Sequence, residues 1–227
     1  MGKNAYDKFL TVLLVILIIG IVGTAGYLLY KLFEKNKLNT DADAFLNEFD
    51  NYINENSNNT VEEEPLYNQA EENNAVKEQT TGKVRGISTD ALTYKGYKVA
   101  GKLEMPTVNL QYPVLDQMTN ANAIEVSVAI QYGVGLNNVG NTVIIGHNYR
   151  SGLFFGSNKN LQIGDTIYIT DWQTGTKRAY TIYNKYTTEE SDTSYYSRNT
   201  NGAREVSLVT CQSNNKYRLV VLAREAS

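Results

Sequence analysis

The second half of the chain consists of short apolar segments separated by turn residues. Eight segments are rich in β-branched and aromatic residues, and glycine or asparagine stands in most of the gaps between them. The segments are residues 97–105, 108–115, 127–133, 141–147, 165–170, 177–188, 205–211 and 217–225. This pattern predicts a mainly β domain over residues 94–227, either an antiparallel-rich barrel or a sandwich.

An uncharged run of 22 residues, from Phe9 to Tyr30, precedes this domain. As a helix it would be roughly 33 Å long, enough to cross a hydrocarbon core of about 30 Å. The alternatives are a cleaved signal peptide and a buried helix, but the run is longer than the apolar region of a usual signal peptide. We therefore predict an uncleaved single-pass transmembrane anchor at residues 9–30, with residues 1–8 as a short cytoplasmic tail.

The charges beside the predicted anchor do not set its orientation. Lys3 and Lys8 precede it, while Lys31, Lys35 and Lys37 follow it, so the two sides carry similar positive charge. An extracytoplasmic C-terminal domain is therefore an expectation that depends on the catalytic interpretation given below.

Two segments of different composition separate the anchor from the β domain. Residues 31–57 predict a juxtamembrane helical segment, because apolar residues recur there at helical spacing. These residues are Phe45, Leu46, Phe49, Tyr52 and Ile53. Residues 58–93 are polar, acidic and rich in asparagine, which predicts a linker between the helix and the domain.

Charge and cysteine content exclude several classes of function. The net charge is −3, so the chain lacks the basic excess that is typical of nucleic-acid binding. With one cysteine, the chain can form no internal disulfide and no multi-cysteine zinc site.

The single cysteine, Cys211, and the single histidine, His147, each stand at the carboxyl end of a predicted strand. Arg218 begins the strand that follows Cys211. A lone buried thiol or a hydrogen-bonded histidine is common in any fold, but an unpaired thiol is unusual outside the cytoplasm. If these strand ends meet, the imidazole can activate the thiol, and the guanidinium can stabilise a thiolate or an oxyanion.

Four stretches of the sequence resemble the sortases. They are SLVTC (207–211), YRLVVLA (217–223), IIGHN (144–148) and EMPTVNLQYPVLD (104–116). Sortases are the cysteine transpeptidases of Gram-positive bacteria, which join surface proteins to the cell wall or to each other. The resemblance covers about residues 97–225 and implies an eight-stranded sortase-type β-barrel with short helices. Within the family, the sequence is similar to class B or class D sortases, and the subclass stays open.

The resemblance implies a role for each matching residue. Cys211 is the implied nucleophile, His147 the implied proton donor and acceptor, and Arg218 the implied partner of the oxyanion or the substrate. Thr210 is implied to help bind the substrate or the oxyanion.

A loop over residues 188–204 is expected to wall the substrate pocket, by analogy with the family. Leu208, Tyr195 and Tyr196 are the residues expected to line it. Some sortases bind calcium through acidic loop residues, which here would be Glu189, Glu190 and Asp192. A solvated loop is the preferred interpretation, and the chemistry requires no metal or cofactor.

The implied reaction cleaves an LPxTG-like sorting signal of a surface protein through a thioester on Cys211. The acyl group then passes to an amine of peptidoglycan, or of a lysine on a pilin or another surface protein. Two alternatives stay open. One is a cysteine peptidase that hydrolyses the same thioester, and the other is a non-catalytic, membrane-tethered β-domain that binds a wall polymer or a partner through tyrosine-rich loops such as residues 191–199.

Overall fold

The computed structural model describes residues 3–57, 92–117, 122–212 and 215–226. The chain forms two compact units, Met1–Asp41 and Ala42–Ser227. The predicted linker at residues 58–93 lies almost entirely outside the described residues.

The first unit contains the N-terminal part of helix α1 (Lys3–Ser57). By length and composition, α1 is the one helix in the described ranges that could cross a membrane. Its apolar side chains are exposed in this unit, for example Leu14 at 56% and Ile19 at 65%. Exposed apolar surface of this extent is unfavourable in water but not in a lipid bilayer.

The second unit is mainly β. Its strands are β1 (Thr93–Tyr94), β2 (Tyr97–Met105), β3 (Leu110–Leu115), β4 (Val128–Gly133), β5 (Gly140–Ile145), β6 (Thr166–Asp171), β7 (Lys177–Glu189), β8 (Arg204–Gln212) and β9 (Tyr217–Glu225). Its short helices are η1 (Pro106–Val108), α2 (Ala123–Val126) and η2 (Phe155–Asn160). All eight predicted strands form, and their ends differ from the prediction by at most two residues.

The strands form a closed barrel. Their order is β1-β2-β3-β4-β5-β8-β9-β7-β6, and an additional pairing of β2 with β6 closes the ring of eight strands from β2 to β9. The two-residue β1 lies outside this ring and pairs only with β2. The mainly β fold and the eight-stranded barrel predicted from the sequence are therefore confirmed.

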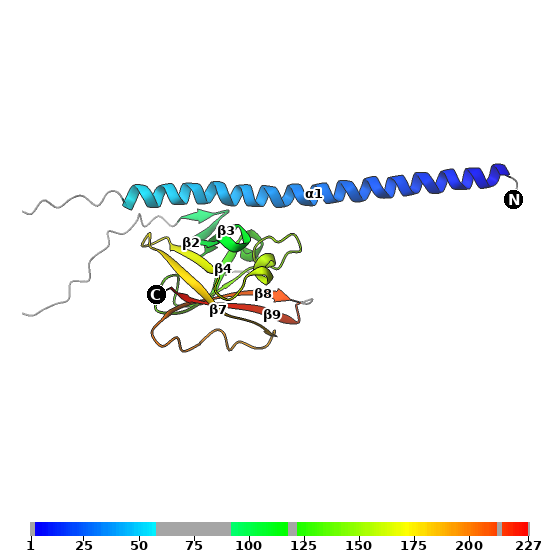
Figure 1. Cartoon of the computed structure of the whole chain (residues 1–227). Helices are drawn as coiled ribbons and strands as arrows, with labels where there is room; N and C mark the ends of the chain where they lie inside the picture. Colours follow the sequence, from blue (N-terminus) through cyan, green and yellow to red (C-terminus); the bar gives the residue numbers. More distant parts are fainter. Residues whose placement is uncertain (1–2, 58–91, 118–121, 213–214, 227) are drawn as a thin grey trace, which may run out of the picture. The chain divides into compact units, whose positions relative to one another are not determined.

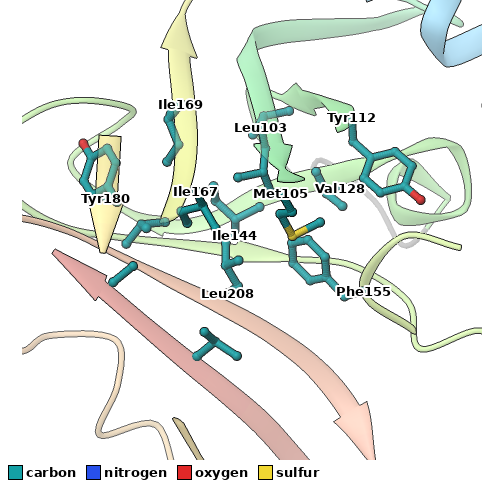
Figure 2. Packing of buried hydrophobic residues seen from close by; sticks show 14 of the residues in the cluster. Leu103, Met105, Tyr112, Val128, Ile144, Phe155, Ile167, Ile169, Tyr180 and Leu208 are labelled. Atoms are coloured by element: carbon teal, nitrogen blue, oxygen red, sulfur yellow. The ribbon is translucent and has the colours of Figure 1, made fainter. Parts of the chain in front are cut away.

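The inward-facing residues of the strands fill the barrel. Because successive side chains of a strand point to opposite faces, every second residue enters this core. Figure 2 shows part of it, including Leu103, Met105, Ile144, Ile167, Ile169 and Leu208, each at most 1% exposed. This packed interior holds the strand ends in fixed positions.

A second apolar cluster lies between the barrel and residues 42–57 of α1. Phe49 is 1% exposed, and its ring lies 5.3 Å from that of Trp172 at the end of β6. Beside it, Lys102 of β2 donates hydrogen bonds of 2.7 and 2.6 Å to the carboxylate of Asp50. This part of α1 is thus an integral element of the β unit.

Phe49→Ala should lower the free energy of unfolding of the second unit by about 3 kcal/mol, because it leaves a cavity beneath the helix. Chemical denaturation of the full chain in detergent measures this, with the fluorescence of Trp172, the single tryptophan, as the probe. Asn47→Ala, on the exposed side of the same helix, is the control and should change stability by less than about 0.5 kcal/mol. Equal effects of the two variants would show that the helix does not dock through Phe49.

Candidate active site

The ends of three neighbouring strands bring His147, Cys211 and Arg218 together. Strands β5 and β8 are parallel, with Val143 paired to Ser207 and Ile145 to Val209. Strands β8 and β9 are antiparallel and lie side by side in Figure 1, and Cys211 is directly opposite Arg218. His147 follows the end of β5, so it lies next to the carboxyl end of β8.

All three residues lie on the outer face of the barrel. Val143 and Ile145 of β5, Val209 of β8, and Val220 of β9 form an apolar cluster on this face. His147, Cys211 and Arg218 continue the same alternation along their strands. The strand pairing and the period of two therefore direct an imidazole, a thiol and a guanidinium to one surface.

A cavity of about 510 Å³ covers this surface. His147, Cys211 and Arg218 all line it. The other lining residues are Ile124, Gln131, Ile145, Gly146, Glu190, Thr193, Tyr195, Tyr196, Val209 and Thr210. Cys211 is partly exposed and has a free thiol, so the cavity gives a ligand access to it.

The backbone around His147 is fixed on both sides. The amide of Gly146 donates to the carbonyl of Val209 at 3.3 Å, and the side chain of Asn148 donates to the carbonyl of Cys211 at 2.6 Å. The carbonyl of His147 itself accepts a hydrogen bond of 3.0 Å from the amide of Phe155. A side chain at Gly146 would collide with Val128, 2.8 Å away, so glycine allows this close approach.

The ring of His147 contacts a carboxylate from another element. Its Nε2 lies 2.8 Å from Oε1 of Glu125, a residue of α2. The other carboxylate oxygen of Glu125 accepts a hydrogen bond of 2.5 Å from the hydroxyl of Tyr149. This bond from Tyr149, together with the positive charge of a protonated His147, holds the pKa of Glu125 below its usual range.

Arg218 is anchored at the rim of the cavity. It donates a hydrogen bond of 2.6 Å to Oε1 of Glu190, and two further bonds to the carbonyls of Asn215 and Tyr217. Its side chain is 18% exposed, whereas that of Glu190 is 63% exposed. The guanidinium is therefore oriented by its own strand end, while Glu190 is a solvated partner.

Thr210, Tyr195 and Tyr196 are among the residues that line the cavity. Thr210, however, donates its hydroxyl proton to the carbonyl of Gly146 at 2.7 Å, so the hydroxyl connects β8 to the end of β5. Burial raises the pKa of Tyr195 to about 12, and this phenol is neutral.

Leu208 does not line the cavity, contrary to the expectation from the sequence. It is fully buried and lies in the barrel core, where Figure 2 shows it close to Ile144. The reason is the period of two, which directs Leu208 inward when Val209 and Cys211 face outward. Val209 lines the cavity instead.

The acidic residues of the loop after β7 take part in local contacts. Glu190 pairs with Arg218, and Asp192 accepts hydrogen bonds from the hydroxyl of Thr188 and the amide of Ser194. These two hydrogen bonds lower the pKa of Asp192. Within the described ranges, no group of three or more His, Cys, Asp or Glu residues is arranged to hold a metal ion.

Comparison with known proteins gives one family. The family model described as the Sortase domain matches residues 103–226, more than half of the chain. The chain belongs to the sortase family. Sortase A of Bacillus anthracis is 28% identical over 127 residues, which are 55% of this chain and 58% of that protein. The chain therefore spans less than two thirds of the length of this relative.

Solved sortases share the fold. Sortase A from Corynebacterium diphtheriae is similar with a TM-score of 0.52 and 23% identity, over 58% of this chain and 62% of that chain. The Clostridium perfringens Sortase D5 transpeptidase gives a TM-score of 0.51 and 21% identity, over 57% of this chain and 80% of that chain. The barrel described above is thus a sortase barrel.

A buried polar network holds the loop that walls the cavity around Cys211. Asn141 of β5 donates its amide to the carbonyls of Tyr195 and Tyr196, at 2.8 and 3.0 Å. Arg198 of the loop donates to the side chain of Asn141 at 2.8 Å and pairs with the carboxylate of Glu205 in β8. Although burial opposes it, hydrogen bonds from Tyr183, Arg224 and Arg198 lower the pKa of Glu205.

Sequence reasoning did not find Glu125, Asn141 or Arg198. Each acts across the sheet or from a loop, at separations of 22 to 57 residues from its partner. Neither a motif nor a periodic pattern in the sequence marks these three residues.

Arg198→Ala should loosen the loop at residues 190–203, because Asn141 and Glu205 each lose a charged partner. Hydrogen exchange of the full chain should show faster exchange of these loop amides by about tenfold or more. Arg224→Ala is the matched control, since Arg224 binds the same carboxylate of Glu205 from β9 and not from the loop. Equal protection of the loop in both variants would contradict the role of Arg198.

Proposed function

We propose that this chain is a membrane-anchored cysteine transpeptidase that cleaves an LPxTG-like sorting signal and transfers the acyl group to an amine. One observation carries the proposal above all others. The single thiol, the single imidazole and the guanidinium of Arg218 line the same cavity, at the ends of adjacent strands.

In the first half of the reaction, the Cys211 thiolate attacks the carbonyl carbon of the threonine in the signal. A C–S bond forms, and the carbonyl oxygen becomes an oxyanion. When this intermediate collapses, the C–N bond to the following glycine breaks, and protonated His147 gives its proton to the leaving amine. The product is a thioester between the signal and Cys211.

In the second half, an amine of the acceptor attacks the thioester carbon. His147 takes the proton from this amine, the C–S bond breaks, and Cys211 leaves as a thiolate. A new amide bond joins the surface protein to its acceptor. The proton that His147 takes from the acceptor amine replaces the one that it gave to the leaving amine, so the cycle balances without a metal, an oxidant or a cofactor.

Arg218 is the proposed partner of the oxyanion. Cys211 and Arg218 are paired residues of β8 and β9 and both line the cavity, which supports a permanent positive charge near the carbonyl oxygen on which the negative charge would develop. The bonds of Arg218 to two backbone carbonyls hold the guanidinium in place before the substrate arrives. Its third contact is with the exposed side chain of Glu190, and a substrate carbonyl could replace that contact.

The surface next to the cavity offers room for an extended peptide. Five extended residues span about 17 Å, so a bound signal would run along an elongated stretch of this surface. A second hollow of about 760 Å³ adjoins the cavity around Cys211, and Gln131 and Tyr196 line both. The larger hollow contains neither Cys211, His147 nor Arg218 among its lining residues, so the chemistry belongs to the smaller one.

The proposed location is the outer surface of the cell membrane. The apolar part of α1 at residues 9–30 would be the single-pass anchor, with residues 1–8 in the cytoplasm. Residues 31–57 would follow as a juxtamembrane helix, residues 58–93 as a linker, and residues 94–227 as the catalytic barrel. Surface proteins with a C-terminal sorting signal would be the substrates, and peptidoglycan or a pilin or surface-protein lysine would supply the amine.

A peptide ligation assay tests this function. The full chain in detergent is mixed with a pool of LPxTG-like peptides, with and without an amine acceptor, and the products are identified by mass spectrometry. We expect an amine-dependent ligated product that Cys211→Ala and His147→Ala abolish. Arg218→Lys keeps the positive charge but loses the planar set of N–H donors of the guanidinium. This variant should lower kcat/KM by about 10²- to 10³-fold.

Lys216→Ala is the control, because this charged side chain lies near Arg218 in the sequence and does not line the cavity. It should ligate at the wild-type rate. Cleaved peptide without ligation, at every acceptor concentration, would favour the peptidase alternative. No turnover of any peptide would favour the non-catalytic binding domain.

A further inference from the structure

The orientation of the His147 ring is set mainly by its contact with the carboxylate of Glu125. The backbone on either side of His147 is fixed by the hydrogen bonds of Gly146, Asn148 and Phe155. The ring packs beside Tyr149, with centroids 5.2 Å apart. Among the described residues, Glu125 supplies the one hydrogen bond to an imidazole nitrogen. The rotamer of His147 therefore depends on Glu125.

Glu125 is itself held in position. Its helix α2 is only four residues long, but Ala123 in it is fully buried in an apolar cluster. Ser127, just after the helix, is buried and donates to the carbonyl of Pro113 at 2.6 Å. The hydroxyl of Tyr149 fixes the second carboxylate oxygen. The carboxylate thus reaches His147 from an anchored element.

This contact also decides which nitrogen of His147 carries a proton. An ionised carboxylate has no proton to donate, so Nε2 must donate to Oε1 of Glu125. In the neutral imidazole, Nδ1 is then the nitrogen with a free lone pair. In the imidazolium, Nδ1 carries the proton that is not already bound to a carboxylate.

We propose that Glu125 is a positioning residue for His147, which orients the ring and keeps Nε2 protonated so that Nδ1 exchanges the proton with the leaving and the entering amine. This inference rests on the proposed function and adds to it a carboxylate from α2, supported by Tyr149. The carboxylate does not line the cavity, so it acts through the imidazole and not on the substrate.

NMR first measures the hydrogen bond between His147 and Glu125, and this measurement needs no substrate. The chain has a single histidine, so ¹⁵N-histidine labelling of the full chain in detergent gives the signals of one ring. We expect a protected, downfield Nε2–H proton in the wild type. It should be lost in Glu125→Ala and retained in Glu48→Gln, which changes an exposed glutamate on α1. A wild-type ring without this proton would overturn the proposal.

Kinetics of the ligation reaction test the consequence. Glu125→Ala should lower kcat by about tenfold or more, the loss expected for one charged hydrogen bond in a solvated setting, with little change in KM for the peptide. Glu125→Gln, which keeps the shape and a weaker acceptor, and Tyr149→Phe should lie between Ala and the wild type. Unfolding midpoints of the variants in detergent verify that each one folds.

Two kinetic results would contradict the proposal. If Glu125→Gln and Glu125→Ala ligate as fast as the wild type, the carboxylate is merely structural. If they ligate faster, Glu125 restrains the ring in an unproductive position. Failure of the wild type to ligate any peptide would refute the proposed function, while the NMR signal would still decide whether Glu125 controls the protonation of His147.

Discussion

The parallel pairing of β5 with β8 is the constraint on which the site depends. It aligns Ile145 with Val209, so that the two strands end together and His147 emerges beside Cys211. The antiparallel pairing of β8 with β9 then places Arg218 opposite the thiol. His147 meets Cys211 and Arg218, which stand more than 60 residues later in the sequence, because of backbone hydrogen bonds, and the three side chains need no contact with one another to be brought together.

The closed barrel keeps this arrangement rigid. Inward-facing residues of the same strands, such as Ile144, Leu208 and Val221, are fully buried, so the strand ends cannot shift without opening the core. Outward-facing residues form the floor of the cavity, and the loop with Tyr195 and Tyr196 forms its wall. Asn141 connects floor and wall, since its amide binds both the loop carbonyls and Arg198. The strand ends that carry the thiol, the imidazole and the guanidinium are therefore held before any ligand binds, and the proposed activity would gain from such preorganisation.

Local patterns in the sequence account for most of the fold. Strand positions follow from β-branched segments and turn residues, and the candidate site follows from two residue types that occur once each. Leu208 was assigned to the pocket wrongly, because it stands three residues before Cys211, an odd separation that puts it on the opposite face of the strand. Glu125 and Arg198 could not be foreseen, since a hydrogen bond between side chains on separate elements leaves no periodic trace in the sequence. Glu190 was considered as a calcium ligand, whereas the structure pairs it with Arg218.

The claim that Cys211 carries the acyl group is tested most directly by the mass of the intact protein. The full chain is mixed with a sorting-signal peptide without an acceptor, quenched in acid within the first turnover, and digested to locate any adduct. The account predicts that Cys211 gains the mass of the peptide up to and including its threonine, less one water, and that hydroxylamine removes this adduct as it does a thioester. An unmodified Cys211 that still reacts with a small alkylating reagent, across a pool of signal peptides, would contradict it.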